Sequence, residues 1–356
     1  MFKKFLLAGA VAALGLTSAT AADVPGLQKG NVTLKSVSAL AFSPQGVLFI
    51  GDPAAQTIVA VNTNDTTSAG SGDVNVDKID DKIGSLLGVT GKDVKIADVK
   101  VNPASGNVYL AASRAASPAP VIVKLGRDGK VSEFSLKDVP FAAVKLPNAT
   151  ASPRDPGGAI TNMAFVDGKL IVAGLSSEEF ASTLRVIPFP FKDADKGAGI
   201  EIFHGAHGKI ETHSPVRTFA PYKVNGADFI LAAYTCTPLV RIPVSDLKAG
   251  AKVKGATIAE LGNRNRPLDM VVYTKDGKDY LLLANSARGV MKIPAAGVDK
   301  AEAITARPKS DKAGVGYETI AELKDVTQLD ALDGGRALLV IAPQGGSVSL
   351  KTIPMP

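Results

Sequence analysis

Cysteine and histidine are scarce in this chain of 356 residues, which has one cysteine, Cys236, and three histidines. A single cysteine excludes an internal disulfide, so buried apolar surface must stabilise the fold, and a chain of this length can supply it. The Cys-x-x-Cys-His sequence of c-type haem proteins is absent, as are the Gly-x-Ser-x-Gly turn, the phosphate-binding loop and the dinucleotide-binding glycine pattern. These absences argue against covalent haem and against the common nucleotide-binding folds.

Clustered positive charge is also lacking. The net charge is +6, and it falls to +4 without Lys3 and Lys4, while the remaining lysines and arginines are spread along the chain. Nucleic-acid binding requires basic residues gathered on one face. We therefore expect no nucleic-acid partner and interpret the charge as favouring solubility.

The first 21 residues have the three parts of a secretory signal peptide. Lys3 and Lys4 form a basic start, residues 5–16 are apolar, and Ala19-Thr20-Ala21 is a cleavage sequence of small residues. We expect cleavage after Ala21 and a periplasmic or secreted protein, with residues 22–356 as a single domain. No later stretch reaches the roughly 18 apolar residues of a membrane-spanning helix, so we expect none in the mature chain.

The rest of the chain repeats one pattern six times: an apolar strand, a turn with glycine, a second apolar strand, a turn and a third strand. The copies begin near Val37, Ile96, Ile160, Val216, Leu268 and Val326. A repeat of this length made of strands alone is typical of blades around an axis. The sequence thus predicts an all-β fold, a β-propeller of six blades. Seven is the alternative count, if residues 64–95 or 126–158 hide another blade.

The ends of the chain suggest how the ring closes. Most copies have a fourth, outer strand in the segment that precedes the next copy, but the last copy ends at the C-terminus. An equivalent strand, residues 31–35, precedes the first copy. We expect this N-terminal strand to complete the last blade and so remove the exposed sheet edges of an open array.

Polar residues interrupt four of the apolar innermost strands, at Asp98, Asn162, Asp269 and Gln328. Oxygen ligands that converge on an axis suit a calcium ion; the alternative is a channel lining solvated by water. In this arrangement the chain resembles six-bladed propellers of the gluconolactonase and paraoxonase type, and more generally propellers of the NHL and YVTN types. The resemblance implies an axial calcium and a lactonase-like activity, but this chain has Ala39 where that family has an acidic ligand in its first blade.

All three histidines, His204, His207 and His213, lie in residues 203–213, in the loop that enters the fourth copy. Cys236 lies in the turn between the second and third strands of that copy, which the propeller geometry brings to the same face. Imidazole and thiolate ligands favour zinc or copper. The sequence predicts a transition-metal site formed by these four residues; the alternative is a polar surface loop beside an inert, buried cysteine.

A third group of residues is cationic and flanks the first two strands of the fifth copy. Arginine side chains bind carboxylates and phosphates in pairs, and Arg217 and Arg114 are expected at the same rim. The group predicts a site for a small anionic ligand or for an envelope protein; the alternative is a set of turn residues that bond the backbone. Its members are Asn263, Arg264, Arg266, Asn285 and Arg288.

Three functions follow from these observations. The first is an exported propeller that binds a ligand or a partner protein on its upper face, with or without a metal. The second is a metal-dependent enzyme at the channel mouth, either a lactonase-like hydrolase or a copper oxidoreductase. The third is a structural module of an envelope complex. The sequence favours the first, because large propellers are rigid platforms whose loops carry the function.

Overall fold

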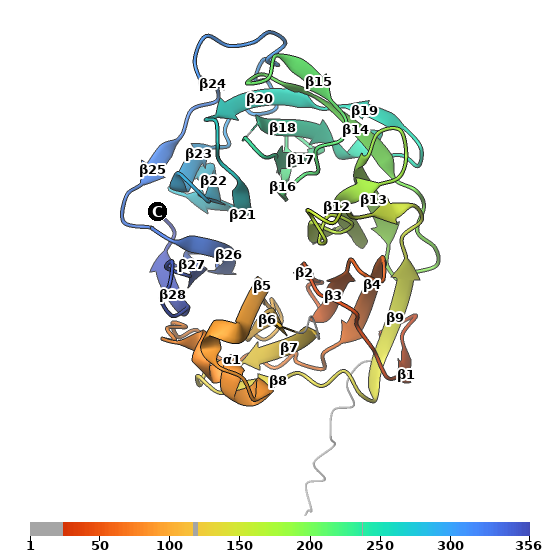
Figure 1. The fold of residues 1–356 in the computed structure, drawn as a ribbon, viewed down its shortest axis with the longest axis vertical. Coiled ribbons are helices and arrows are strands. Elements are labelled where there is room, and N and C mark those ends of the chain that lie inside the picture. Colours follow the sequence, from red (N-terminus) through yellow and green to blue (C-terminus); the bar gives the residue numbers. More distant parts are fainter. Residues whose placement is uncertain (1–23, 117–119, 237) are drawn as a thin grey trace, which may run out of the picture.

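The computed structural model describes residues 24–116, 120–236 and 238–356, and the predicted signal peptide lies outside them. The described residues form a ring of β-sheets around a central axis (Figure 1). The prediction of an all-β propeller is confirmed. No helix in this part of the chain has the length and hydropathy needed to cross a membrane.

The first three sheets, numbered as blades in chain order, contain the following strands from the axis outward. Blade I contains β2 (Leu40–Phe42), β3 (Val47–Asp52), β4 (Thr57–Asn62), β9 (Val139–Lys145) and β1 (Gln28–Gly30). Blade II contains β5 (Val94–Val101), β6 (Val108–Arg114), β7 (Pro120–Leu125) and β8 (Val131–Glu133). Blade III contains β11 (Asn162–Val166), β12 (Lys169–Ser176), β13 (Ser182–Pro188) and β14 (Ala198–His204), with the short strands β10 (Ala149–Thr150), β15 (Lys209–Glu211) and β19 (Lys252–Lys254) at its edges.

The other three sheets complete the ring. Blade IV contains β16 (Thr218–Val224), β17 (Ala227–Ala233), β18 (Pro238–Pro243), β20 (Ala256–Leu261) and β24 (Lys312–Gly314). Blade V contains β21 (Pro267–Lys275), β22 (Lys278–Asn285), β23 (Gly289–Pro294) and β25 (Glu318–Ile320). Blade VI contains β26 (Val326–Asp333), β27 (Arg336–Ile341) and β28 (Ser349–Pro354).

The blade count differs from the prediction in one respect. Five of the sheets have at least four strands, whereas blade VI has three, so the described residues form five complete blades and one incomplete blade. No seventh sheet occurs in these residues. Residues 64–95 contain α1 (Ile79–Leu87), η1 (Gly91–Asp93) and the start of β5, and residues 126–158 contain β8, β9 and β10; a further short helix, η2 (Val244–Asp246), follows β18.

The blades do not follow one another around the ring in chain order. The innermost strands β2, β5, β26, β21 and β16 are neighbours in this order (Figure 1). Strand β11 follows β16 and is again beside β2. Blade II therefore lies between blades I and VI. The cause is a crossover: after β8 the chain returns to blade I, where β9 pairs with the outer edge of β4 in antiparallel register, with Thr57 opposite Lys145.

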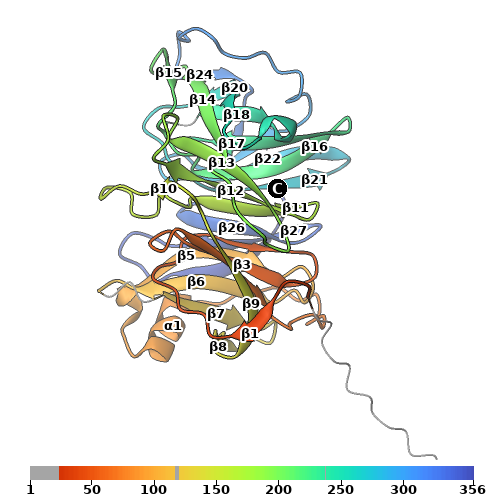
Figure 2. The ribbon, with the colours of Figure 1, turned by 90° about the vertical axis from the view of Figure 1, so that its right-hand side faces the viewer.

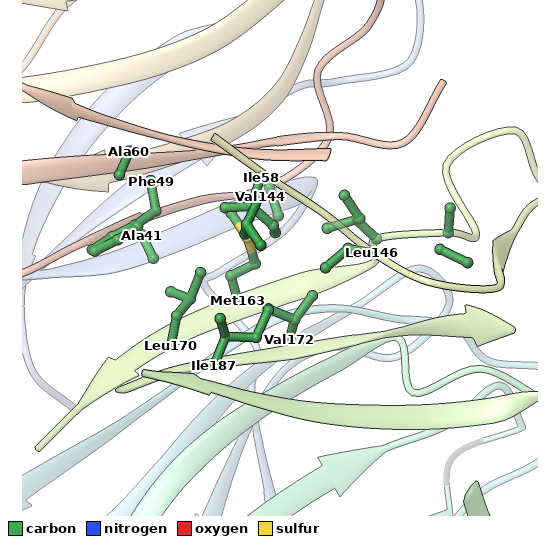
Figure 3. Close-up of a cluster of buried hydrophobic side chains, with 14 of the residues drawn as sticks. Ala41, Phe49, Ile58, Ala60, Val144, Leu146, Met163, Leu170, Val172 and Ile187 are labelled. Atoms are coloured by element: carbon green, nitrogen blue, oxygen red, sulfur yellow. The ribbon is translucent and has the colours of Figure 1, made fainter. Parts of the chain in front are cut away.

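A separate apolar core fills each space between neighbouring blades. Because both faces of a blade are covered, its strands are continuous apolar runs, and every residue of β3 is buried. Figure 3 shows the core between blades I and III, where Phe49 and Ile58 face Met163 and Leu170. This core fixes blade III beside blade I, although all of blade II lies between them in sequence.

The predicted closure by the N-terminal strand is wrong. β1 pairs with β9 at the outer edge of blade I, with Gln28 opposite Phe141. The segment that follows is held on the same blade, where the backbone N–H groups of Lys35 and Ser36 donate to the Asp52 carboxylate at 2.6 and 3.0 Å. The blade order is the reason, because blade II separates the N-terminal segment from blade VI.

Residues 74–79, from the connection between blades I and II, cover the edge of blade VI instead. Val76 and Leu350 exchange two backbone hydrogen bonds of 3.0 and 2.9 Å, and Ile79 donates to the carbonyl of Val348. The Thr352 hydroxyl bonds both backbone groups of Val74, at 2.8 Å to its N–H and 3.0 Å to its carbonyl. This segment does for blade VI what a fourth strand does in the other blades.

We expect Thr352→Val to lower the free energy of unfolding by about 1–3 kcal/mol, because it leaves the buried backbone groups of Val74 without this partner. Urea unfolding followed by circular dichroism measures the change. Thr319→Val, at an exposed position of β25, is the matched control and should have little effect. Equal stabilities of the two variants would contradict this account of ring closure.

Candidate functional site

The histidine, cysteine and arginine residues of the predicted sites lie in segments at one face of the ring, whereas Asp98, Asn162 and Asp269 lie along its axis. We call this face the upper face, where the innermost strands begin. The N–H of Arg217, just before β16, donates to the carbonyl of Ala233 at the end of β17 (2.9 Å), so the β17–β18 turn emerges at this face. In the edge-on view β10 and the β14–β15 hairpin lie on one side of the ring (Figure 2).

The β14–β15 hairpin brings two histidines together. His204 is the last residue of β14, and a tight turn follows, in which the N–H of His207 donates to the His204 carbonyl at 3.1 Å and Gly208 takes a positive φ of 64°. The two imidazole rings have centroids 3.9 Å apart. His204 is 2% exposed, whereas His207 is exposed.

Glu211 orients both rings from the opposite strand of the hairpin. Its two carboxylate oxygens contact the Nδ1 atoms of His204 and His207, at 2.9 and 2.7 Å. Although burial favours the neutral acid, the hydrogen bonds from His207, His204 and Ser214 outweigh it and lower the pKa of Glu211 to about 2. Burial lowers the pKa of His204. The Nε2 atom of His204 is buried and has no hydrogen-bond partner among the described residues.

Cys236 completes a group of three from the next blade. It lies half-buried in the β17–β18 turn with a positive φ of 62°, and its N–H donates to the carbonyl of Asn265 at 2.8 Å. One ligand atom each from His204, His207 and Cys236 lies within 4.8 Å of the others. The structure thus brings together three of the four predicted ligands. His213 is exposed, bonds Thr212 and does not belong to the group.

A second buried carboxylate, Glu260 of β20, lies under the histidine turn. Its Oε1 accepts the N–H of Gly205 at 2.6 Å, and its Oε2 is buried without a partner among the described residues. Burial raises the pKa of Glu260 to about 7, against the opposing effect of the Gly205 hydrogen bond. Sequence reasoning missed this residue, because it lies at an ordinary position of an outer strand.

Two of the four predicted axial residues, Asp98 and Asp269, flank a lysine, Lys100, that was not predicted as a site residue. The Nζ atom of Lys100 lies 3.5 Å from carboxylate oxygens of both Asp98 and Asp269, and its side chain is 14% exposed. Lys100, Asp269 and Asn162 line a cavity of about 440 Å³ on the axis of the ring. Gln328 instead lines a second cavity, at the mouth of the channel. The ammonium occupies the space between the two carboxylates, where a calcium ion would bind. Axial calcium stays a prediction, and Lys100 would compete with it.

The same carboxylates connect neighbouring blades. Asp98 accepts the backbone N–H of Leu40 in blade I at 2.7 Å, and Asp269 accepts that of Leu329 in blade VI at 3.1 Å. Asp330 of blade VI accepts the N–H of Val101 in blade II at 2.7 Å. A signal was present in the sequence, because Lys100 alternates with Asp98 on one face of the innermost strand β5.

Electrostatics keep this axial lysine charged. Burial alone would lower the pKa of Lys100, but Asp269, Asp98 and Asp330 raise it more, so that it lies above the usual lysine value. Burial raises the pKa of Asp98 to about 7, against the lowering effect of Lys100. Burial also raises the pKa of Asp330.

The predicted anion-binding residues are divided between two places. Arg266 lines the channel mouth. Arg288 instead pairs with Asp311 at 2.9 Å and contacts the carbonyl of Asn263 at 3.4 Å. Asn285 is buried and donates to the carbonyl of Leu283, and Arg264 is exposed with a positive φ of 57°.

Comparisons with known proteins give only weak structural likenesses. No family model matches the chain, and no curated protein matches it. Among solved structures, the PQQ-bound aldose sugar dehydrogenase of Streptomyces coelicolor aligns at 13% identity and a TM-score of 0.35, over 93% of this chain and 98% of its own. Streptogramin B lyase aligns at 10% identity and a TM-score of 0.37, over 92% and 97%. At these values neither likeness carries an inference about function.

We expect Lys100→Met to lower the free energy of unfolding at pH 8 by about 3–5 kcal/mol, because it leaves buried carboxylates without their cation. The loss should shrink toward about pH 4. Without the ammonium, the pKa values of Asp98 and Asp330 in the folded state lie further above their unfolded values, so stability is lost as the pH rises through the folded values. Denaturant unfolding at the two pH values measures this, with the exposed Lys169→Met as the control. A pH-independent loss would refute the electrostatic explanation.

Proposed function

We propose that the protein is an exported β-propeller whose upper face binds a copper or zinc ion through His204, His207 and Cys236. The observation that carries the proposal is the buried Nε2 atom of His204, which has no partner among the described residues and belongs to a group of two imidazoles and one thiol. Export rests on the signal-peptide sequence of residues 1–21.

The ligand chemistry supports these two metals. Imidazole and thiolate are ligands of zinc and copper, whereas calcium and magnesium prefer oxygen. Metal–ligand bonds of about 2.0–2.3 Å place ligand atoms within roughly 4 Å of one another. The three ligand atoms lie within 4.8 Å of one another. A small shift of the exposed His207 side chain is therefore sufficient to bring them to metal-binding distances.

The surroundings of the two rings also suit a metal. Glu211 contacts the Nδ1 atoms of both histidines, so the Nε2 atoms remain for the ion. A carboxylate behind a ligating imidazole fixes its tautomer and makes it a better ligand. Three protein ligands leave a coordination position for water or a ligand, as in catalytic zinc sites. Among the described residues the group has three ligand residues, and this number is the observation in favour of the second candidate, a metal-dependent enzyme at the upper face.

We expect the protein to bind one equivalent of Cu(I) or Zn(II) in competition titrations with a chromophoric chelator. His204→Ala and Cys236→Ser should each weaken binding by more than roughly a hundredfold, because each removes a ligand, and Glu211→Gln by about 10–100-fold through the imidazoles. His213→Ala is the matched control, since this histidine of the same loop lies outside the group. Binding that depends on His213 as strongly as on His204, or no binding of either metal, would overturn the proposal.

Export has its own test. We expect expression of the whole chain in a bacterium to yield a protein of the periplasmic fraction whose N-terminus is Ala22, as read by intact-mass spectrometry. Replacing Lys3 and Lys4 with glutamate should retain the uncleaved chain, because a signal peptide requires a basic start. An intact N-terminus in the unaltered protein would contradict export.

A further inference from the structure

The channel opens at the upper face in a cavity of about 590 Å³. This volume is within the range of small-molecule sites. All six blades or the segments that enter them contribute to its wall, so the cavity exists only in the closed ring. One contributor from each, in blade order, is Ser38, Lys95, Thr161, Arg217, Arg266 and Gln328.

The wall carries an excess of positive charge. Its ionisable side chains are Lys95, Arg154, Arg217 and Arg266 against a single carboxylate, Asp155. Asp155 is already paired, with its Oδ2 at 2.6 Å from Nη1 of Arg217. Within the described residues, none of the other three cations forms an ion pair. The channel mouth therefore carries a net positive charge, which attracts negative ligands.

Two of these cations influence each other directly. Burial and then the nearby charge of Arg217 lower the pKa of Arg266, against the opposing effect of Asp155. An anion between the two arginines would relieve this repulsion. The guanidinium group of Arg266 suits the task, since it presents parallel N–H donors to the two oxygens of a carboxylate or phosphate. Arg217 contributes its Nη2 atom, because its Nη1 and Nε atoms already bond Asp155 and Thr235.

The rest of the wall indicates an organic ligand. Val37, Ile96 and Leu268, which are half-buried, supply apolar surface. A free inorganic ion would use the charges alone, whereas a ligand with a carbon skeleton would also cover the apolar wall.

We propose that the channel mouth binds a small organic anion with at least two negative charges, carried by carboxylate or phosphate groups, and that Arg266 and Arg217 hold one of these groups. The proposal gives a chemical class to the ligand that the sequence predicted for the upper face, and it does not depend on the metal. The metal group lies close by, because Nε of Arg217 bonds the hydroxyl of Thr235, the residue before Cys236, at 3.2 Å.

Isothermal titration with succinate, with glycerol 3-phosphate and with inorganic phosphate tests the proposal. We expect saturable binding of succinate or glycerol 3-phosphate, and tighter binding of that ligand than of inorganic phosphate. Arg266→Gln should weaken it by roughly tenfold or more, as expected for the loss of a charged hydrogen bond. Arg264→Gln is the matched control, because this arginine lies two residues away on the same loop, is exposed and does not line the cavity.

Each outcome decides one question. Equal weakening by Arg264→Gln and Arg266→Gln would reduce the effect to general surface charge and overturn the proposal, as would the absence of saturable binding at millimolar concentrations. Inorganic phosphate that binds as tightly as the organic anions would refute the role of the apolar wall. If Cys236→Ser still binds the organic anion, anion binding is independent of the metal. Failure of the metal site and failure of the anion site are therefore distinguishable.

Discussion

The ring depends on a buried cation at its axis. The ammonium of Lys100 lies between Asp98 of its own strand and Asp269 of blade V, with Asp330 of blade VI close enough to raise its pKa. Buried charges are tolerated only where they are paired and hydrogen-bonded. Each of the three carboxylates meets this condition by accepting a backbone N–H from an adjacent blade. The innermost strands of four blades are therefore positioned by one electrostatic group.

Both proposed sites follow from this convergence. The metal group combines the last residue of β14 in blade III with a turn of blade IV. The cavity at the channel mouth takes wall residues from all around the ring. Neither site exists in an isolated blade. A rigid ring that carries short functional loops at one face is a common solution, because the scaffold fixes the loop ends and leaves their sequences free to vary.

The sequence was sufficient for the blades but not for their order. Apolar runs separated by glycine turns identified the innermost three strands of every blade, and most of the outer strands, because strand period and turn chemistry are local properties. The return of β9 to blade I had no local signal, since its apolar pattern would suit the edge of several blades. The erroneous assignment of residues 31–35 to the last blade has the same origin. Once blade II is placed between blades I and VI, residues 74–79 are the nearest chain that can cover β28.

The sequence by itself determined the class of fold, the face that carries the loops, and the grouping of His204 and His207 with Cys236. The two histidines are separated by a single tight turn. Cys236 lies on a loop that propeller geometry brings to the same end of the ring. Only the tertiary structure decided that Glu211 holds both imidazoles, that His213 is left outside, and that Lys100 lies between Asp98 and Asp269. The physical reason is that strand pattern is encoded by adjacent residues, whereas the choice of a charged partner depends on which distant strands meet at the axis and how deeply they are buried.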